Sequence, residues 1–335
     1  MSENVINVYC AGGCGINIGS KKFEADRDKI NPGFAKMQTY YIDTSDSNIS
    51  QNNFKNDNVY LVDISNDPTG PKGGSGKKRD SNHKAISERI NDILLNFKPS
   101  STLNVIIHSA SGGSGSVIGP LLVSELLARK QPVVVFMIGS HASKIETQNS
   151  IRTLESYENI ASIKETPVVA MYLENSIEHN RTETDNKVHL GLLITSLIFS
   201  GCIKELDDSD LRNFLNYTKV TSFKPRLAYL RPMEGVIKLN KEETIISAVS
   251  VTDNTVPPEL NYPVEYQATG YIREENQDVL KNCEKPIQLI ILNGTFHTIV
   301  NNLKLKMKEF ENARNASIDK PIVTEIDDSN DGLVF

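Results

Sequence analysis

The chain contains the stretch Ser109-Ala110-Ser111-Gly112-Gly113-Ser114-Gly115-Ser116, which stands where a predicted strand ends and a predicted helix begins. A second stretch of the same kind, Cys10-Ala11-Gly12-Gly13-Cys14-Gly15, follows the strand-like run Val5–Cys10. Glycines let the backbone approach an anion closely, and the N–H groups of a helix N-terminus point toward it. A single turn of this kind also serves close packing of a helix on a strand. Two of them, with the Ser114 and Ser116 hydroxyls, predict a phosphate cradle.

Strands and helices alternate through the first half of the chain, which predicts an α/β fold with a parallel sheet covered on both faces. The second half resembles a smaller α+β region, and between them lies a helix that is apolar nearly all round and therefore expected to be buried. The expected strands are Val5–Cys10, Thr39–Asp43, Asn58–Ile64, Leu103–His108, Pro132–Gly139, Pro167–Leu173, Leu227–Leu230, Thr244–Val251 and Ile287–Leu292. The expected helices follow the two glycine turns, run from Asp80 or Ser81 to Phe97, begin near Glu146, cover Thr184–Ser200 and extend from Phe296 to about Ala313.

These patterns predict four parts of the chain. They are a nucleotide-binding domain over residues 1–183, a central helix over 184–203, a smaller α+β activation domain over 204–293, and a C-terminal helix with an acidic tail over 294–335. The tail, Glu325–Phe335, holds four acidic residues and no basic one, so a solvated end is the simplest expectation.

Composition excludes several classes of protein. The 335 residues include 42 acidic and 36 basic ones, and a formal net charge of −6 argues against a protein that coats nucleic acid. No apolar run is long enough to span a membrane, and Met1–Cys10 does not resemble a secretion signal, so we expect a cytoplasmic protein with no membrane partner. The four cysteines and six histidines lack the spacing of disulfide frameworks or metal ligands, so we expect no protein-bound metal site.

Three common motifs are excluded because required residues are missing at one or two positions. The dinucleotide fingerprint would require glycine where Ile18 stands, and the P-loop would require glycine at Pro71 and a hydroxyl residue at Lys78. The nucleophile elbow of the α/β-hydrolases would require glycine at Ser116.

The order of the remaining loops resembles the tubulin/FtsZ superfamily. The signature glycine turn of that family corresponds to Ser111–Val117, with Ser111 and Val117 in place of glycines. In length and loop style the chain is most similar to the phage tubulins, and next to their plasmid and prophage relatives. The other loops that carry the resemblance are Gly12–Asn17, Asp43–Ser45, Gly73–Lys78, Glu146–Leu154, Leu173–Asn175 and Asp185–Asn186.

The resemblance implies a GTPase that uses GTP and GDP with Mg²⁺. The loop at Gly73–Lys78 would read the γ-phosphate, Glu146 would lie near the ribose, and Asn175 and Asn186 would read guanine. The implied GTP-binding residues are Gly12, Gly13, Cys14, Asn17, Asp43, Thr44, Gly73, Gly74, Ser75, Gly112, Gly113, Ser114, Gly115, Ser116, Glu146, Asn175 and Asn186.

The acidic segment Glu205–Phe214 has two interpretations. Acidic residues favour the positive end of a helix dipole, so the segment can be an ordinary helix start. The resemblance implies instead that it enters the nucleotide site of the next subunit, where Asp207 and Asp210 position the attacking water. An i, i+3 spacing puts both on one helix face, while another alignment pairs Asp210 with Asn213.

The resemblance also implies head-to-tail polymerisation into dynamic filaments that hydrolyse GTP at subunit junctions and position phage DNA, through an adaptor because the chain is acidic. The tail residues Asp327, Asp328, Asp331 and Phe335 would contact the neighbouring subunit. The alternatives are a plasmid or prophage segregation filament, a nucleotide-dependent α/β oxidoreductase or transferase that does not polymerise, and a polymer that binds GTP without hydrolysing it.

Overall fold

The computed structural model describes residues 4–26, 33–50, 56–64, 79–175, 181–253, 255–273, 276 and 283–316. The strands are β1 (Val5–Ala11), β2 (Lys36–Asp43), β3 (Val59–Leu61), β4 (Leu103–Ser109), β5 (Val133–Ser140), β6 (Val168–Asn175), β7 (Ile203–Lys204), β8 (Leu227–Glu234), β9 (Thr244–Thr252), β10 (Tyr266–Ile272) and β11 (Ile287–Asn293). The helices are α1 (Gly12–Asp26), α2 (Arg79–Ser87), α3 (Ile90–Asn96), α4 (Gly115–Ala128), α5 (Lys144–Ile163), α6 (Arg181–Ile198), α7 (Asp208–Leu215) and α8 (Thr295–Ala316), with short 3₁₀ turns at Asn56–Asn58 and Tyr217–Lys219.

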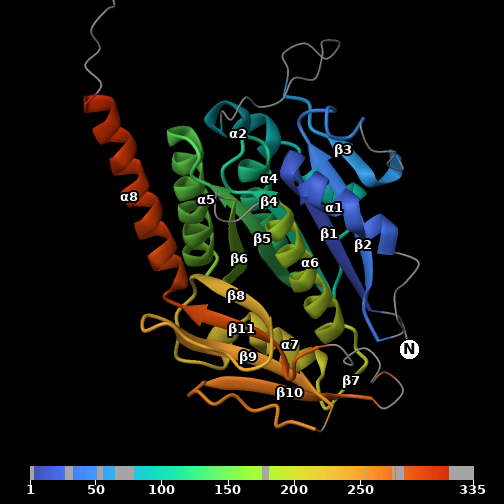
Figure 1. Cartoon of the computed structure of the whole chain (residues 1–335). Coiled ribbons are helices and arrows are strands. Elements are labelled where there is room, and N and C mark those ends of the chain that lie inside the picture. Colours follow the sequence, from blue (N-terminus) through green and yellow to red (C-terminus); the bar gives the residue numbers. More distant parts are fainter. Residues whose placement is uncertain are drawn as a thin grey trace, which may run out of the picture.

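The described strands form one continuous sheet in the order β3-β2-β1-β4-β5-β6-β8-β11-β9-β10-β7 (Figure 1). Its first half, from β3 to β6, is parallel throughout, as the sequence predicts. Helices cover both faces of this half, which is why β4 and β5 are buried along almost their whole length. Parallel strands end at one edge, so the loops that follow β1, β2 and β4 meet there.

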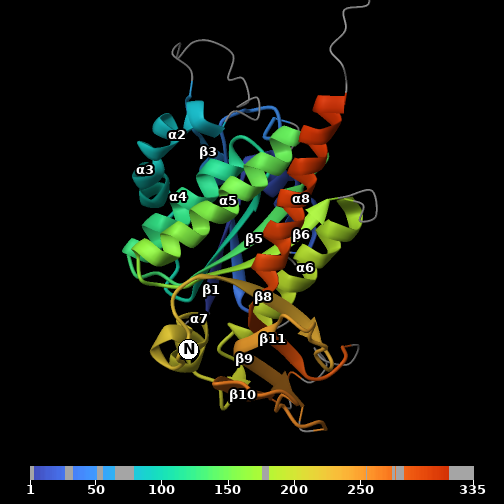
Figure 2. The same ribbon diagram turned by 90° about the vertical axis from the view of Figure 1, so that its left-hand side faces the viewer.

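Two apolar cores lie on the two faces of the sheet. One draws buried residues from α1, α6 and α7, and the other draws them from α2, α3, α4, α5 and α8. In the second core α8 runs beside α5 (Figure 2), so the C-terminal helix packs on α5 and on β8. Within the described residues, no helix has both the length and the apolar character needed to cross a membrane.

The second half of the sheet continues the first without a break, because β6 pairs in parallel with β8. Beyond β8 the pairing is antiparallel through β11 to β9, and β10 then lies parallel to β9. The three strands predicted here are present. The sequence missed β10, whose Gln267, Thr269 and Gly270 make a weak strand pattern. The four-part division of the chain stays a prediction.

The helix predicted from Asp80 or Ser81 to Phe97 is wrong as a single element. The chain forms α2 and then α3, separated by a tight turn in which the Arg89 N–H donates to the Ile86 carbonyl. The apolar side chains of the pattern, including Ile86, Ile93 and Phe97, are nevertheless buried. Burial of the same residues is therefore achieved by two short helices, which the periodicity alone did not distinguish from one.

The central helix α6 corrects a second expectation in part, because the middle of the helix is less buried than predicted. Its inner face packs on β6, β8 and β11, but Leu190 and Leu193 on the outer face are 40% and 48% exposed. The strands of the second half extend the sheet sideways from β6 instead of covering the outside of α6 (Figure 1). The last part of the helix is nevertheless buried all round, as predicted, because Ile194–Ile198 are five consecutive buried residues.

Glycines set how closely α1 and α4 approach the strands beneath them. A Cβ on Gly15 would collide with the backbone carbonyl of Ile107, and one on Gly115 would lie 2.8 Å from the Ala11 oxygen. Gly12 has a φ of +70°, and its Cβ would lie 2.8 Å from the Gly115 nitrogen. Close helix–strand packing therefore accounts for part of the glycine content of both turns.

We expect Gly15→Ala to lower the free energy of unfolding by about 1–3 kcal/mol, because overpacking against a backbone atom cannot be relieved by rotating a side chain. The matched control is Gly112→Ala, whose new Cβ makes an ordinary contact at 3.4 Å with the Ser109 Cβ. Denaturant unfolding without nucleotide measures both, and equal stability of the two variants would contradict the packing argument.

Candidate functional site

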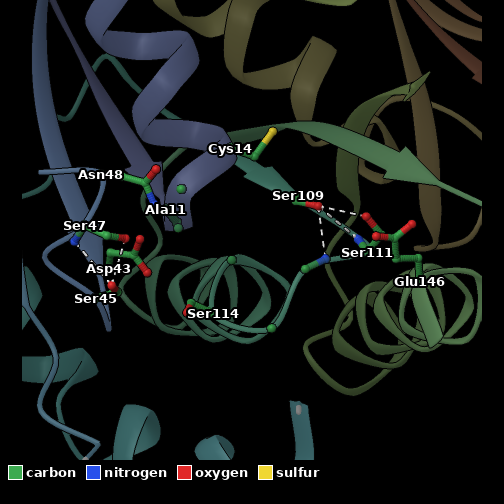
Figure 3. A pocket seen from close by; sticks show the side chains of 15 residues that line it. Ala11, Cys14, Asp43, Ser45, Ser47, Asn48, Ser109, Ser111, Ser114 and Glu146 are labelled. Carbon is green, nitrogen blue, oxygen red and sulfur yellow. Dashed lines mark hydrogen bonds between the residues drawn. The ribbon is translucent and has the colours of Figure 1, made fainter. Parts of the chain in front are cut away.

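A cavity of about 450 Å³ opens at the carboxyl ends of β1, β2 and β4 (Figure 3). Its size is within the range of small-molecule sites. The residues that line it are Ala11, Gly12, Gly13, Cys14, Asp43, Ser45, Ser47, Asn48, Ser109, Ser111, Gly112, Gly113, Ser114, Gly115 and Glu146. Two glycine turns that are a hundred residues apart in sequence therefore form one site.

The turn before α4 is held in shape by Ser109. Its Oγ accepts hydrogen bonds from the backbone N–H groups of Ser111, at 3.2 Å, and Gly112, at 3.0 Å (Figure 3). Helix α4 begins at Gly115, directly after the turn, so its first N–H groups lack carbonyl partners within the helix. This end of α4 is positively polarised and borders the cavity, which suits a phosphate.

Asp43 supplies the negative charge of the cavity on the side opposite to Glu146 (Figure 3). Its carboxylate accepts the Thr44 N–H at 2.7 Å, and burial raises the pKa of Asp43. The Thr44 hydroxyl lies 2.6 Å from the Ser114 hydroxyl, so the loop after β2 is tied to the turn before α4.

Glu146 lies in the first turn of α5, which is capped by Ser143 through a 3.3 Å hydrogen bond from the Glu146 N–H. The Ser140 hydroxyl donates to the Glu146 carboxylate at 2.9 Å. One turn further on, the Asn149 side chain donates to the Ser111 carbonyl at 3.1 Å. These bonds fix the start of α5 against the cradle.

The acidic segment lies at the amino ends of the parallel strands, opposite to the carboxyl ends where the cavity opens. Asp208, Leu211 and Arg212 of α7 line a small groove together with Ser101, Thr102 and Pro132, which precede β4 and β5. The cavity described above is lined by residues that follow the other ends of β1, β2 and β4. The acids of α7 therefore cannot reach the cavity of their own chain.

Comparison with known proteins places the chain in a family. Residues 5–166 match the family model described as Tubulin/FtsZ family, GTPase domain. A phage tubulin-like protein of Pseudomonas phage PhiPA3 is 31% identical over 69% of this chain and 67% of its own length. The chain belongs to the phage tubulin-like proteins. It is a GTPase of the tubulin/FtsZ family, and the parallel strands β1 to β5 lie within the residues that match the GTPase domain.

Other relatives match along their full length. The phage tubulin-like protein of Pseudomonas phage phiKZ is 26% identical over 100% of this chain and 99% of its own. The solved structure titled as a protofilament of TubZ from bacteriophage PhiKZ has 26% identity and a TM-score of 0.78, over 98% of this chain and 99% of that one. The PhuZ201 filament structure has 21% identity and a TM-score of 0.79, with the same coverage. These likenesses confirm the tubulin-like fold.

Most of the residues predicted for the phosphate side of this tubulin-like site line the cavity, but some do not. The Ser116 hydroxyl is buried and donates to the carbonyls of Gly112, at 2.5 Å, and Gly113, at 3.3 Å. Because its hydroxyl is used inside the turn, Ser116 is not among the residues that line the cavity, and its contact with GTP stays a prediction. Asn17 also lies outside the lining, and its side chain donates to the Asn48 amide oxygen at 3.5 Å.

The residues predicted to read guanine flank the cavity without lining it. Asn175 ends β6, and its amide oxygen is buried with no hydrogen-bond partner among the described residues. Asn186 is an exposed residue of α6. The Asp185 charge contributes to the raised pKa of the Cys14 thiol, which means that this part of α6 lies near the first glycine turn. Gly73, Gly74, Ser75 and the tail residues Asp327, Asp328, Asp331 and Phe335 lie outside the described residues.

One part of the cavity lining was not among the predicted site residues. Ser45, Ser47 and Asn48 form a polar wall after the Asp43 loop, and only the polar composition of that loop signalled them. Burial raises the pKa of the Cys14 thiol to about 12, so this cysteine stays protonated and unreactive near neutral pH.

We expect Gly113→Val to abolish nucleotide binding while the protein stays folded. Gly113 lines the cavity and is not in the left-handed backbone region, so a side chain there takes up cavity space without backbone strain. Fluorescent GTP titration measures the affinity, and thermal unfolding measures the fold. GTP affinity equal to that of the parent would contradict the assignment of the cradle. Ser116→Ala, which alters a hydroxyl turned away from the cavity, is the control and should retain binding within about tenfold.

Proposed function

We propose that this GTPase assembles head to tail into filaments, in which the acidic segment of one subunit completes the nucleotide site of the next. The observation that carries the proposal is that the cavity and α7 lie at opposite ends of the strands of one sheet. Translation of subunits along the strands would bring α7 of one copy to the cavity of another. Because the two surfaces differ, such a contact is heterologous and generates an open polymer. The PhiKZ relative solved as a protofilament supports this arrangement.

The proposed ligand is GTP or GDP, with guanine read by Asn175 and Asn186. An amide can donate to and accept from a base edge at the same time. The amide oxygen of Asn175, which is buried and has no donor among the described residues, supports this role, because a buried acceptor without a donor is costly and the N–H groups of guanine are donors.

The residues present also suit Mg²⁺ bound with the nucleotide. Magnesium is usually held by one or two carboxylates together with phosphates, and Asp43 is the carboxylate that lines the phosphate side of the cavity. Burial disfavours the charged form of Asp43, and a cation would favour it. When bound, the ion would neutralise charge on the transferred phosphoryl group.

We propose that Asp210, with Asp207, positions the attacking water across the subunit junction. Phosphoryl transfer to water requires little covalent chemistry from the protein, so a correctly placed carboxylate is a sufficient contribution. Both acids lie at the start of α7 and are not enclosed in their own chain. The alternative alignment, which pairs Asp210 with Asn213, gives the same role to Asp210.

In the cell, we propose that the filament works in the cytoplasm of an infected bacterium and positions phage DNA. The support is the source of the relatives, which are phage proteins. The net charge of −6 disfavours direct contact with DNA, so an adaptor would carry that link.

The hydrolysis proposal is tested with Asp210→Asn, which removes the negative charge but keeps an oxygen that can accept hydrogen bonds. We expect normal GTP binding and assembly, with turnover lowered about a hundredfold or more, as for other lost transition-state contacts. Gly113→Val subunits cannot bind GTP but carry Asp210. Adding them should restore part of the turnover of the Asp210→Asn subunits, because the acid acts in trans.

The control is Asp208→Asn, which alters an exposed acid of the same helix. Phosphate release is measured across mixing ratios, below and above the assembly concentration. Parent turnover that does not depend on protein concentration, or full turnover by Asp210→Asn, would contradict the mechanism.

The tail proposal, which places Asp327, Asp328, Asp331 and Phe335 against the next subunit, is tested by deleting residues 325–335. We expect the truncated chain to bind GTP normally and to need at least a severalfold higher concentration to assemble. Added salt should also raise the concentration that the parent chain needs to assemble, because charges are screened over about 8–10 Å near physiological ionic strength. Light scattering measures the critical concentration, and an unchanged value would remove the tail from the interface.

A further inference from the structure

Tyr266, the first residue of β10, contacts the acidic segment from outside it. Its phenol hydroxyl donates to the Asp210 carboxylate oxygen Oδ1 at 3.1 Å and lies 3.3 Å from the Asp210 backbone carbonyl. The Asn213 side chain is also hydrogen bonded to this hydroxyl. The two residues that alternative alignments pair as the water-positioning groups therefore share one tyrosine.

The second oxygen of the Asp210 carboxylate is held from within the helix start. Oδ2 accepts the Asp207 N–H at 3.1 Å, and the Asp207 carboxylate accepts the Asp210 N–H at 3.0 Å, which forms a reciprocal capping box. Each oxygen of Asp210 thus has one fixed donor. Since a carboxylate oxygen can accept a second hydrogen bond, both oxygens retain capacity for a water molecule.

The two donors restrict the carboxylate in different ways. The capping box fixes Asp210 only relative to α7, whereas Tyr266 fixes it relative to the sheet. The tyrosine packs against the core that contains Leu211 and Phe214 of α7, and α7 lies against β9 and β10. Burial and the neighbouring Asp210 raise the pKa of Tyr266 to about 12, so its hydroxyl stays protonated and able to donate.

We propose that Tyr266 is a positioning residue for GTP hydrolysis. It orients the Asp210 carboxylate, which lies beside the nucleotide of the neighbouring subunit in the proposed filament. This inference rests on the proposed role of Asp210. A carboxylate that is already oriented needs no ordering when the junction forms, and small displacements of positioning groups are known to reduce rates strongly.

The test is Tyr266→Phe, which removes the hydroxyl and retains the ring. We expect unchanged GTP affinity, an unchanged critical concentration for assembly, and a kcat per polymerised subunit lowered about three- to tenfold, the scale of one hydrogen bond. The control is Tyr271→Phe on the same strand, whose hydroxyl makes no hydrogen bond to the described residues, and which should keep the parent rate.

A double variant separates positioning from general support of the fold. If Tyr266 acts through Asp210, adding Tyr266→Phe to Asp210→Asn should lower kcat no further, whereas independent effects would multiply. Mixing gives a directional readout. Tyr266→Phe subunits should hydrolyse their own GTP faster when Gly113→Val subunits, with Tyr266 intact, supply the acid.

The outcomes distinguish this inference from the function on which it rests. Parent kcat in Tyr266→Phe, together with an inactive Asp210→Asn, overturns the role of Tyr266 and leaves the trans mechanism in place. A raised critical concentration with unchanged kcat per polymerised subunit also overturns it, because the hydroxyl is then only a structural tether. Full activity of Asp210→Asn overturns both proposals.

Discussion

Backbone contact between Gly12 and Gly115 is the constraint on which the site depends. A Cβ on either residue would lie 2.8 Å from a backbone atom of the other turn, so the ends of β1 and β4 come together only with glycine at both positions. The Thr44–Ser114 hydroxyl pair adds the loop after β2 to the same assembly. The proposed phosphate cradle is therefore one structure built from three loops, and Gly12 and Gly115 both let the loops meet and line the cavity.

The parallel sheet separates the two halves of the proposed reaction. Its strands run from the groove beside α7 to the nucleotide cavity, so each subunit carries a binding site at one edge and an acidic helix start at the other. A single chain would then bind GTP without a complete hydrolytic site. In the proposed filament, assembly itself supplies the missing carboxylate, which links nucleotide turnover to polymerisation.

The two interpretations of the acidic segment are compatible. Asp207 and Asp210 do cap α7, as the simple interpretation of an acidic helix start requires. Capping uses one oxygen of each carboxylate and also holds both acids in fixed positions at an exposed edge. A helix cap that stabilises the subunit can therefore present an oriented acid to a neighbour, with Tyr266 as a second support.

The sequence by itself determined the parallel half of the sheet, the two glycine turns and the acidic segment, because each follows from local periodicity or turn chemistry. Only the tertiary structure decided which glycines pack and which face the cavity, that the Ser116 hydroxyl turns inward, and that the sheet continues from β6 to β8. It also decided that the helix expected before Phe97 is two helices and that Tyr266 meets Asp210. These features depend on the close approach of backbone and side chains that are far apart along the chain, and a local pattern carries no information on such distances.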